Sequence, residues 1–188
     1  FESNENMYSK LSGGGVSYDI IIPSDYMVER LISEDMLLPL DYENIPNYQK
    51  YFDSEKYGYL VENGISDYAV IYNVGTTILI YNKNFVKEKP TSWKVLWDEQ
   101  YKGQVFMFDT YRDTLGAALK KLGYSLNSTD PDELEEAKDL LLEQRKTVNP
   151  IYGVDNGTTM IPAGETSVNM IWSGEGLNLQ EENPNLVY

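Results

Sequence analysis

Three short segments of the sequence combine carboxylates with hydroxyl or aromatic side chains, and each lies where a predicted strand ends. The side chains are Ser24, Asp25 and Tyr26 in the first segment, Asp109, Thr110 and Asp113 in the second, and Trp172 and Glu175 in the third. Carboxylates bind ammonium groups, and aromatic rings attract cations and cover alkyl chains. This combination suits a flexible, multiply protonated alkylamine, and we take these side chains as the candidate ligand-binding set, with no catalytic and no metal-binding residue among them.

Each of these side chains also has a purely structural interpretation. Ser24 and Asp25 can cap a helix, which alone would explain both residues. Asp113 lies in a predicted first helical turn, where the helix dipole favours a negative charge. Trp172 fits a core position, and Glu175 fits a solvated loop. No single segment is therefore specific for a ligand.

The charge of the chain narrows the classes of partner. Asp and Glu number 30 against 15 Lys and Arg, which gives a net charge of −15. Such a chain repels nucleic-acid phosphates and attracts small cations, although excess acid can also serve solubility alone. Cys and His are absent, which excludes zinc sites built from thiolates or imidazoles and triads that depend on His. We expect no nucleic-acid partner and no cofactor.

Hydrophobic patterning predicts an α/β protein. Strands are predicted at residues 18–23, 68–72, 77–81, 105–108 and 168–172, and helices after Ser24, from 109–113 to Gly123, and from Asp130. The successive Ile residues of 18–23 indicate a strand buried on both faces, as in a parallel sheet. Residues 173–176 are predicted to form a loop at a strand's carboxyl end, where open α/β sheets bind ligands. A lobe boundary is expected near residues 82–92.

Several stretches together resemble the spermidine/putrescine-binding proteins of bacterial polyamine importers. They recur in the family's order and cover nearly the whole chain: FESNENMYSKL (1–11), YDIIIPSDYMVERL (18–31), YNVGTTILIYNK (72–83), TSWKVLWDEQYKG (91–103), YRDTLGAALKKLGYSLNSTDP (111–131) and VNMIWSGEG (168–176). The resemblance implies the type II fold of periplasmic binding proteins, with two lobes and largely parallel sheets. Residues 1–82 would be part of the first lobe and residues 83–188 part of the second.

The resemblance also implies roles for individual residues. Ser24 and Tyr26 match cleft residues of the first lobe, and Trp172 matches a ring that stacks on the ligand. Two acidic residues of the family begin a second-lobe helix; the second matches Asp113, whereas the first falls on Thr110, with Asp109 adjacent. Glu175 follows Gly174 in the last of these stretches, and we expect it to add a further charge.

The predicted function is capture of a polyamine outside the cytoplasm for delivery to the permease subunits of an ABC importer, without catalysis. Family segments before Phe1 and after Tyr188 are missing, so we expect an incomplete fold that binds polyamine weakly and forms a homodimer through exposed sheet edges. Three alternatives stay open. One is a binding protein of the same fold for ferric ion, a sugar or an amino acid, and another is a glycoside hydrolase that uses paired carboxylates. The third is a purely structural acidic domain.

Overall fold

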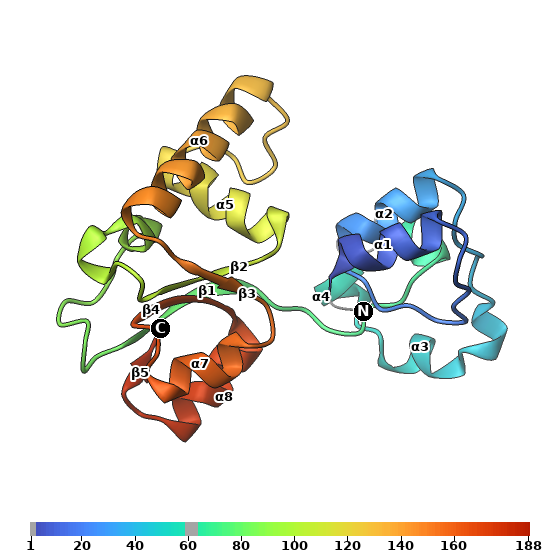
Figure 1. The fold of residues 1–188 in the computed structure, drawn as a ribbon. Coiled ribbons are helices and arrows are strands. Elements are labelled where there is room, and N and C mark those ends of the chain that lie inside the picture. Colours follow the sequence, from blue (N-terminus) through green and yellow to red (C-terminus); the bar gives the residue numbers. More distant parts are fainter. Residues whose placement is uncertain (1–2, 59–63) are drawn as a thin grey trace. The chain divides into compact units, whose positions relative to one another are not determined.

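The computed structural model describes residues 3–58 and 64–188, and the chain forms two compact units, Phe1–Val74 and Gly75–Tyr188 (Figure 1). The division lies before strand β1 (Thr77–Asn82) rather than between residues 82 and 83, because β1 pairs with strands of the second unit. Which lobe of a larger fold each unit represents stays a prediction. Within the described ranges, no helix is both long and apolar enough to cross a membrane.

The second unit is built on a sheet that has the strand order β3-β2-β4-β1-β5 in the described part of the chain. Besides β1, its strands are β2 (Val105–Phe108), β3 (Ile151–Gly153), β4 (Val168–Trp172) and β5 (Leu186–Val187). β2 is parallel to β3 and β4, whereas β1 is antiparallel to β4 and β5. The sheet is thus mixed but mostly parallel, which confirms the α/β fold class and the strands predicted at 77–81, 105–108 and 168–172.

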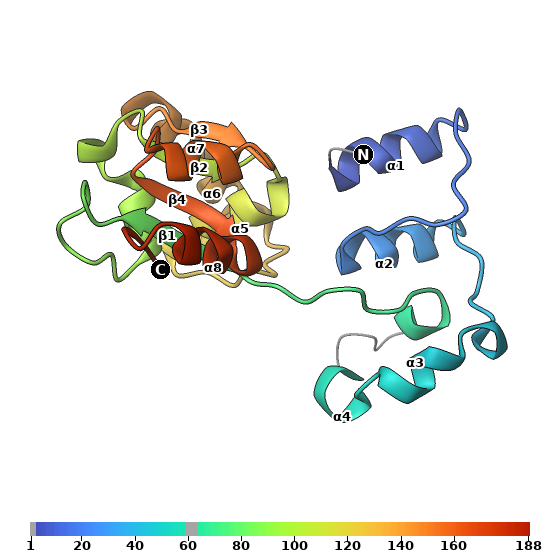
Figure 2. The same cartoon turned by 90° about the horizontal axis from the view of Figure 1, so that it is seen from below.

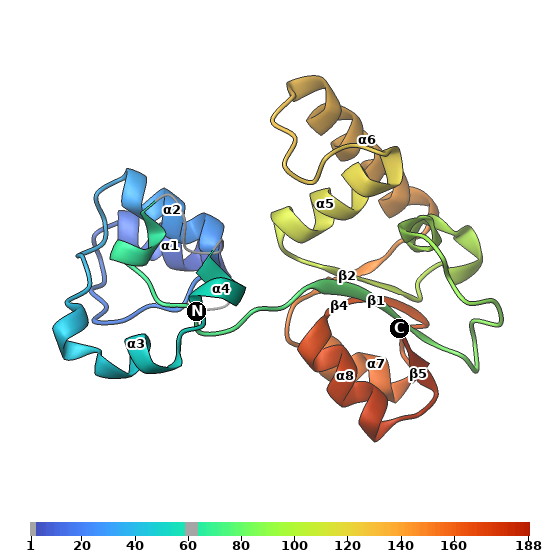
Figure 3. The ribbon, with the colours of Figure 1, turned by 180° about the vertical axis from the view of Figure 1, so that it is seen from behind.

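Helices cover both faces of this sheet (Figures 1 and 3). On one face lie α5 (Tyr111–Leu122) and α6 (Pro131–Thr147), and on the other lie α7 (Gly157–Ala163) and α8 (Ser173–Glu182). Two 3-10 turns, η4 (Trp93–Trp97) and η5 (Glu99–Tyr101), precede β2. Because both faces are covered, every residue of β2 is buried, as its uninterrupted apolar sequence predicts.

Local capping rules place the ends of α5 and α6. Asp130 accepts a hydrogen bond from the Asp132 amide at 2.9 Å, and Pro131 occupies the first helical position. Gly123 ends α5 with a φ of 93°, a left-handed conformation that favours glycine. α5 therefore begins and ends, and α6 begins, close to the positions that the sequence predicts.

The first unit contains helices and extended segments. Its helices are α1 (Asn4–Ser12), α2 (Asp25–Ser33), α3 (Pro46–Tyr51) and α4 (Ser54–Tyr57), with 3-10 turns η1 (Tyr42–Asn44) and η3 (Ile65–Asp67). α1 and α2 lie side by side in all three views (Figures 1, 2 and 3). The side chains of Met7, Met27 and Leu31 are fully buried between them.

The strands predicted at residues 18–23 and 68–72 are wrong. Both segments are largely extended, yet neither has a partner strand among the described residues, so no ladder of hydrogen bonds defines a strand there. Ile20 is 83% exposed, Ile22 60% and Tyr72 81%, so the expected burial on both faces is wrong as well. An apolar run predicts a buried strand only where the rest of the sheet is present to bury it.

Close packing of α7 on β2 gives a prediction about Gly157. A Cβ atom at this position would lie 2.8 Å from the ring of Phe106, which is fully buried and cannot move aside. We expect Gly157→Ala to lower the free energy of unfolding by about 1–3 kcal/mol, measured by urea denaturation.

Gly174, in the first turn of α8, is the matched control, because a Cβ atom there meets nothing within 4 Å. Gly174→Ala should be neutral or stabilising by up to about 1 kcal/mol. Equal effects of the two substitutions would show that the contact between α7 and β2 is not tight.

Candidate functional site

The topology of the second unit brings several predicted residues to one edge of its sheet. β2, β3 and β4 are parallel and end at this edge, where antiparallel β1 begins. Thr77 opens β1 and is the register partner of Trp172, the last residue of β4. Asp109 and Thr110 follow β2 directly. Residues from four strands therefore meet there, as expected for a ligand site of an α/β sheet.

Asp113 has the most defined environment of these side chains. It is half-buried in the first turn of α5, and it accepts hydrogen bonds from the hydroxyls of Thr77 at 2.5 Å and Thr110 at 2.7 Å. An ionised carboxylate can only accept, so both threonines donate their protons to it. The resemblance implies an acidic residue at position 110. Thr110 stands there instead, and its hydroxyl donates to Asp113. Thr77 is part of the site although nothing in its local sequence marked it.

Asp109 does not belong to the group of hydrogen bonds that Thr77 and Thr110 make with Asp113. Its side chain is exposed, and its amide continues the ladder between β2 and β3 by donating to the carbonyl of Gly153 at 2.8 Å. Burial raises the pKa of the neighbouring Tyr152 hydroxyl; the charge of Arg145 lowers it, and the negative charge of Asp109, the smallest of the three effects, raises it. Asp109 therefore acts on the electrostatics of β3, and its contact with a ligand stays a prediction.

Trp172 lies against the aromatic core at the end of β4. Its ring stacks on Phe108 with centroids 4.6 Å apart and planes inclined by 29°. The residue is only half-buried, so part of its surface is accessible. It combines the core role and the exposed aromatic surface that the sequence left as alternatives.

The loop predicted at residues 173–176 is wrong, because α8 begins at Ser173, immediately after β4. The Ser173 amide donates to the carbonyl of Thr76 at 2.8 Å, and its hydroxyl accepts from the Thr76 amide at 3.2 Å. These bonds fix the first turn of α8 against the segment before β1. Glu175 lies half-buried in that turn, where burial and, less strongly, the charge of Asp155 raise its pKa.

In the first unit, Ser24 and Tyr26 are joined through one side chain of α1. The Asn4 Nδ2 atom donates to Ser24 Oγ at 3.0 Å and to the Tyr26 hydroxyl at 2.9 Å. Tyr26 in turn donates to Glu5 Oε1 at 2.8 Å. Asp25 accepts from the Tyr26 amide at 2.8 Å and is exposed, a contact typical of a residue at a helix start. Neither Asn4 nor Glu5 is among the site residues that the sequence predicts.

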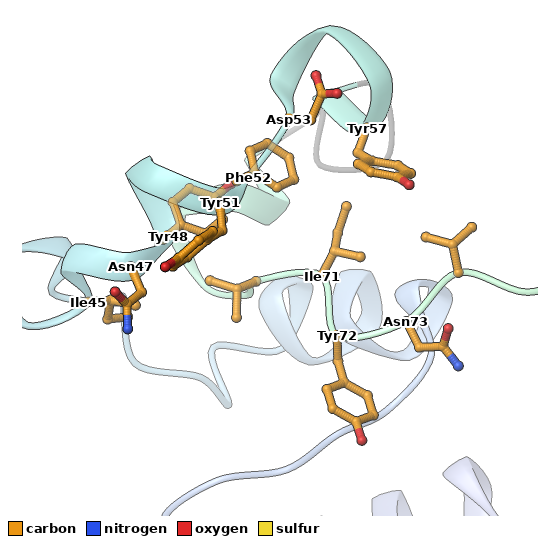
Figure 4. Close-up of a pocket in the computed structure, with 12 residues that line it drawn as sticks. Ile45, Asn47, Tyr48, Tyr51, Phe52, Asp53, Tyr57, Ile71, Tyr72 and Asn73 are labelled. Atoms are coloured by element: carbon orange, nitrogen blue, oxygen red, sulfur yellow. The ribbon is translucent and has the colours of Figure 1, made fainter.

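A cavity of about 550 Å³ lies elsewhere in the first unit, and none of the predicted site residues lines it (Figure 4). Its aromatic walls come from α3, α4 and the extended segment that ends at Val74: Tyr48, Tyr51, Phe52, Tyr57 and Tyr72. Its carboxylate, Asp53, already caps α4 by accepting from the Lys56 amide at 3.1 Å. This cavity is therefore separate from the two clusters of predicted site residues described above.

The raised pKa of Glu175 predicts a pH dependence of stability. The charged form is disfavoured in the folded state, so the contribution of Glu175 is fully favourable below its usual pKa of 4.5 and is lost as the pH rises through the raised pKa. We expect Glu175→Gln to gain stability relative to wild type as the pH rises above about 4.5, measured by urea denaturation.

Asp155→Asn serves as the companion variant, because it removes the one facing charge that adds to the effect of burial on Glu175. In that background, Glu175→Gln should show a smaller gain over the same pH range. Unfolding curves of Glu175→Gln and wild type that shift in parallel with pH would contradict the expectation.

Comparison with known proteins places this geometry in a family. The model of the family described as bacterial extracellular solute-binding protein matches residues 17–187. The chain is 35% identical over 176 residues to the spermidine/putrescine-binding periplasmic protein of Escherichia coli K12, and this match covers 93% of the chain and 50% of the relative. It is 34% identical over 186 residues to the putrescine/cadaverine-binding protein of Pseudomonas aeruginosa, with 94% and 49% covered.

Solved structures agree. The spermidine/putrescine ABC transporter substrate-binding protein PotD of Streptococcus pneumoniae is 36% identical and matches with a TM-score of 0.72, over 100% of this chain and 57% of its own. The chain spans about half the length of the curated relatives it matches. The resemblance seen in the sequence is confirmed, and the chain belongs to the family of bacterial extracellular solute-binding proteins.

Proposed function

We propose that the chain captures a polyamine such as spermidine or putrescine for a bacterial ABC importer. The observation that carries the proposal is the position of Thr77, which bonds the Asp113 carboxylate through its hydroxyl and lies opposite Trp172 in the sheet register. A carboxylate and an aromatic ring are thereby held at one sheet edge. An ammonium group would bind the carboxylate, and the ring would cover the adjoining methylenes.

The negative charge of the chain favours a cationic solute as its ligand. The net charge of −15 attracts polycations over a distance, and the site adds Glu175, whose carboxyl becomes easier to ionise when an ammonium approaches. The net charge does not attract a neutral sugar over a distance, and it repels an anion. We therefore propose ligand contacts for Ser24, Asp25 and Tyr26 within the first unit and, separately, for Asp109, Thr110, Asp113, Trp172 and Glu175 within the second.

The family and the relatives suggest where the chain works. Its family is described as extracellular, and the Escherichia coli relative is periplasmic. Substrate-binding proteins of transporters generally bind and release without catalysis. Our proposal extends these statements to this chain: it acts outside the cytoplasm, passes the polyamine to permease subunits and catalyses no reaction.

The decisive test is calorimetric titration of spermidine and putrescine into the protein as the cell makes it. We expect Asp113→Asn, which keeps the side chain's volume and removes its charge, to weaken binding by about 2 kcal/mol, because a half-buried charge partner is lost. Trp172→Ala should weaken it by about 1–3 kcal/mol through loss of the aromatic surface.

Asp139→Asn is the charge-matched control, since Asp139 is exposed on α6. It should leave the polyamine affinity unchanged. A wild-type protein that ignores polyamines and instead binds ferric ion, a sugar or an amino acid would refute the proposal.

We further propose that the 188-residue chain by itself forms a homodimer. The exposed side chains of Ile20, Ile22 and Tyr72 lie in extended segments without a strand partner among the described residues, and such edges pair readily with another copy. Light scattering should give a mass near twice 21.5 kDa. A strict monomer at high concentration would count against strand pairing between copies.

A further inference from the structure

Two tyrosine–glutamate hydrogen bonds join α1 to α2, and they lie at different positions along the helices. Near the start of both helices, Tyr26 donates to Glu5 at 2.8 Å. At the end of α2, Tyr8 donates to Glu34 at 2.7 Å. The two bonds have the same chemistry, but only the first involves a residue of the proposed ligand site.

The hydrogen bond to Glu5 determines in which direction the Tyr26 hydroxyl donates its proton. Because an ionised carboxylate cannot donate, Tyr26 donates its phenolic proton to Glu5, and its phenolic oxygen acts as an acceptor toward a donor. Asn4 uses it in this way, since its Nδ2 atom donates to the Tyr26 oxygen. The same Nδ2 donates to Ser24 Oγ, and Asn4 Oδ1 accepts from the Ser24 amide at 3.2 Å. The loop before α2 is thus held from the side of α1.

This arrangement matters for a cation in particular. An ammonium group carries only donors, so it binds well only to groups that present lone pairs. A tyrosine whose proton is not committed could turn that proton toward the ammonium and repel it. With Glu5 present, this orientation costs the Tyr26–Glu5 hydrogen bond.

We propose that Glu5 is a positioning residue for polyamine recognition: by taking the proton of Tyr26, it presents the tyrosine oxygen as an acceptor for an ammonium group. The inference rests on the proposed function and extends it to a residue outside the predicted site. Glu5 acts through Tyr26, whose hydroxyl donates to its half-buried carboxylate at 2.8 Å.

The test is the spermidine affinity of single and double variants of the protein as the cell makes it, measured by calorimetry. Glu5→Ala should weaken binding by roughly tenfold, comparable with Tyr26→Phe. Glu5→Gln should restore most of the affinity, because its carbonyl can still accept the tyrosine proton. In the Tyr26→Phe background, Glu5→Ala should change the affinity by less than about twofold, because the effect passes through the hydroxyl that is already gone.

Tyr8→Phe and Glu34→Ala are the matched controls, because they break the equivalent bond at the end of α2. Both should leave the affinity unchanged while thermal denaturation reports any loss of stability. An unchanged affinity in Glu5→Ala overturns the inference, as do effects of Glu5→Ala and Tyr26→Phe that multiply, or controls that weaken binding equally. A wild-type protein that binds no polyamine overturns the proposed function itself, and the inference with it.

Discussion

The antiparallel pairing of β1 with β4 is the constraint on which the second-unit site depends. It sets Thr77 opposite Trp172, and from there the Thr77 hydroxyl reaches Asp113 on α5. If β1 slipped by one residue, Thr77 would turn to the other face of the sheet and its hydroxyl would leave the carboxylate. The hydrogen bond between Thr77 and Asp113, which are 36 positions apart, thus depends on the register of β1 with β4.

The same pairing explains why short segments that directly follow the strands are enough to position the candidate carboxylates. Asp113 comes from the helix after β2, Glu175 from the helix after β4, and both helices begin at the edge where their strands end. Ser173 ties the start of α8 to Thr76, so the two helix starts are held relative to β1. Rigid backbone elements therefore position the carboxylates.

Local signals in the sequence predicted some elements of each unit correctly, such as α2 and β2, and others wrongly. The apolar run of β2, the cap at Asp130 and the stop at Gly123 act over a few residues, and the structure follows them. The Ile run at residues 18–23 has the same character, yet a strand also needs a neighbour, and its partner is not encoded in its own residues. The loop at 173–176 was mistaken for a similar reason: two glycines indicate a turn, but packing of α8 on β1 and β4 decides for helix.

Thr77 and Glu5 escaped sequence reasoning because each acquires its role only through a residue that is distant in the chain. Both residues belong to a cluster in which a carboxylate accepts hydrogen bonds from hydroxyl groups. At Asp113 two threonine hydroxyls give their protons to a carboxylate, and at Glu5 a tyrosine does so. In each cluster the hydroxyl protons are taken up by the protein itself, and what is left toward other groups is oxygen lone pairs and negative charge. A neutral solute, which both donates and accepts, does not require this polarity, whereas a ligand made of ammonium groups and methylenes does.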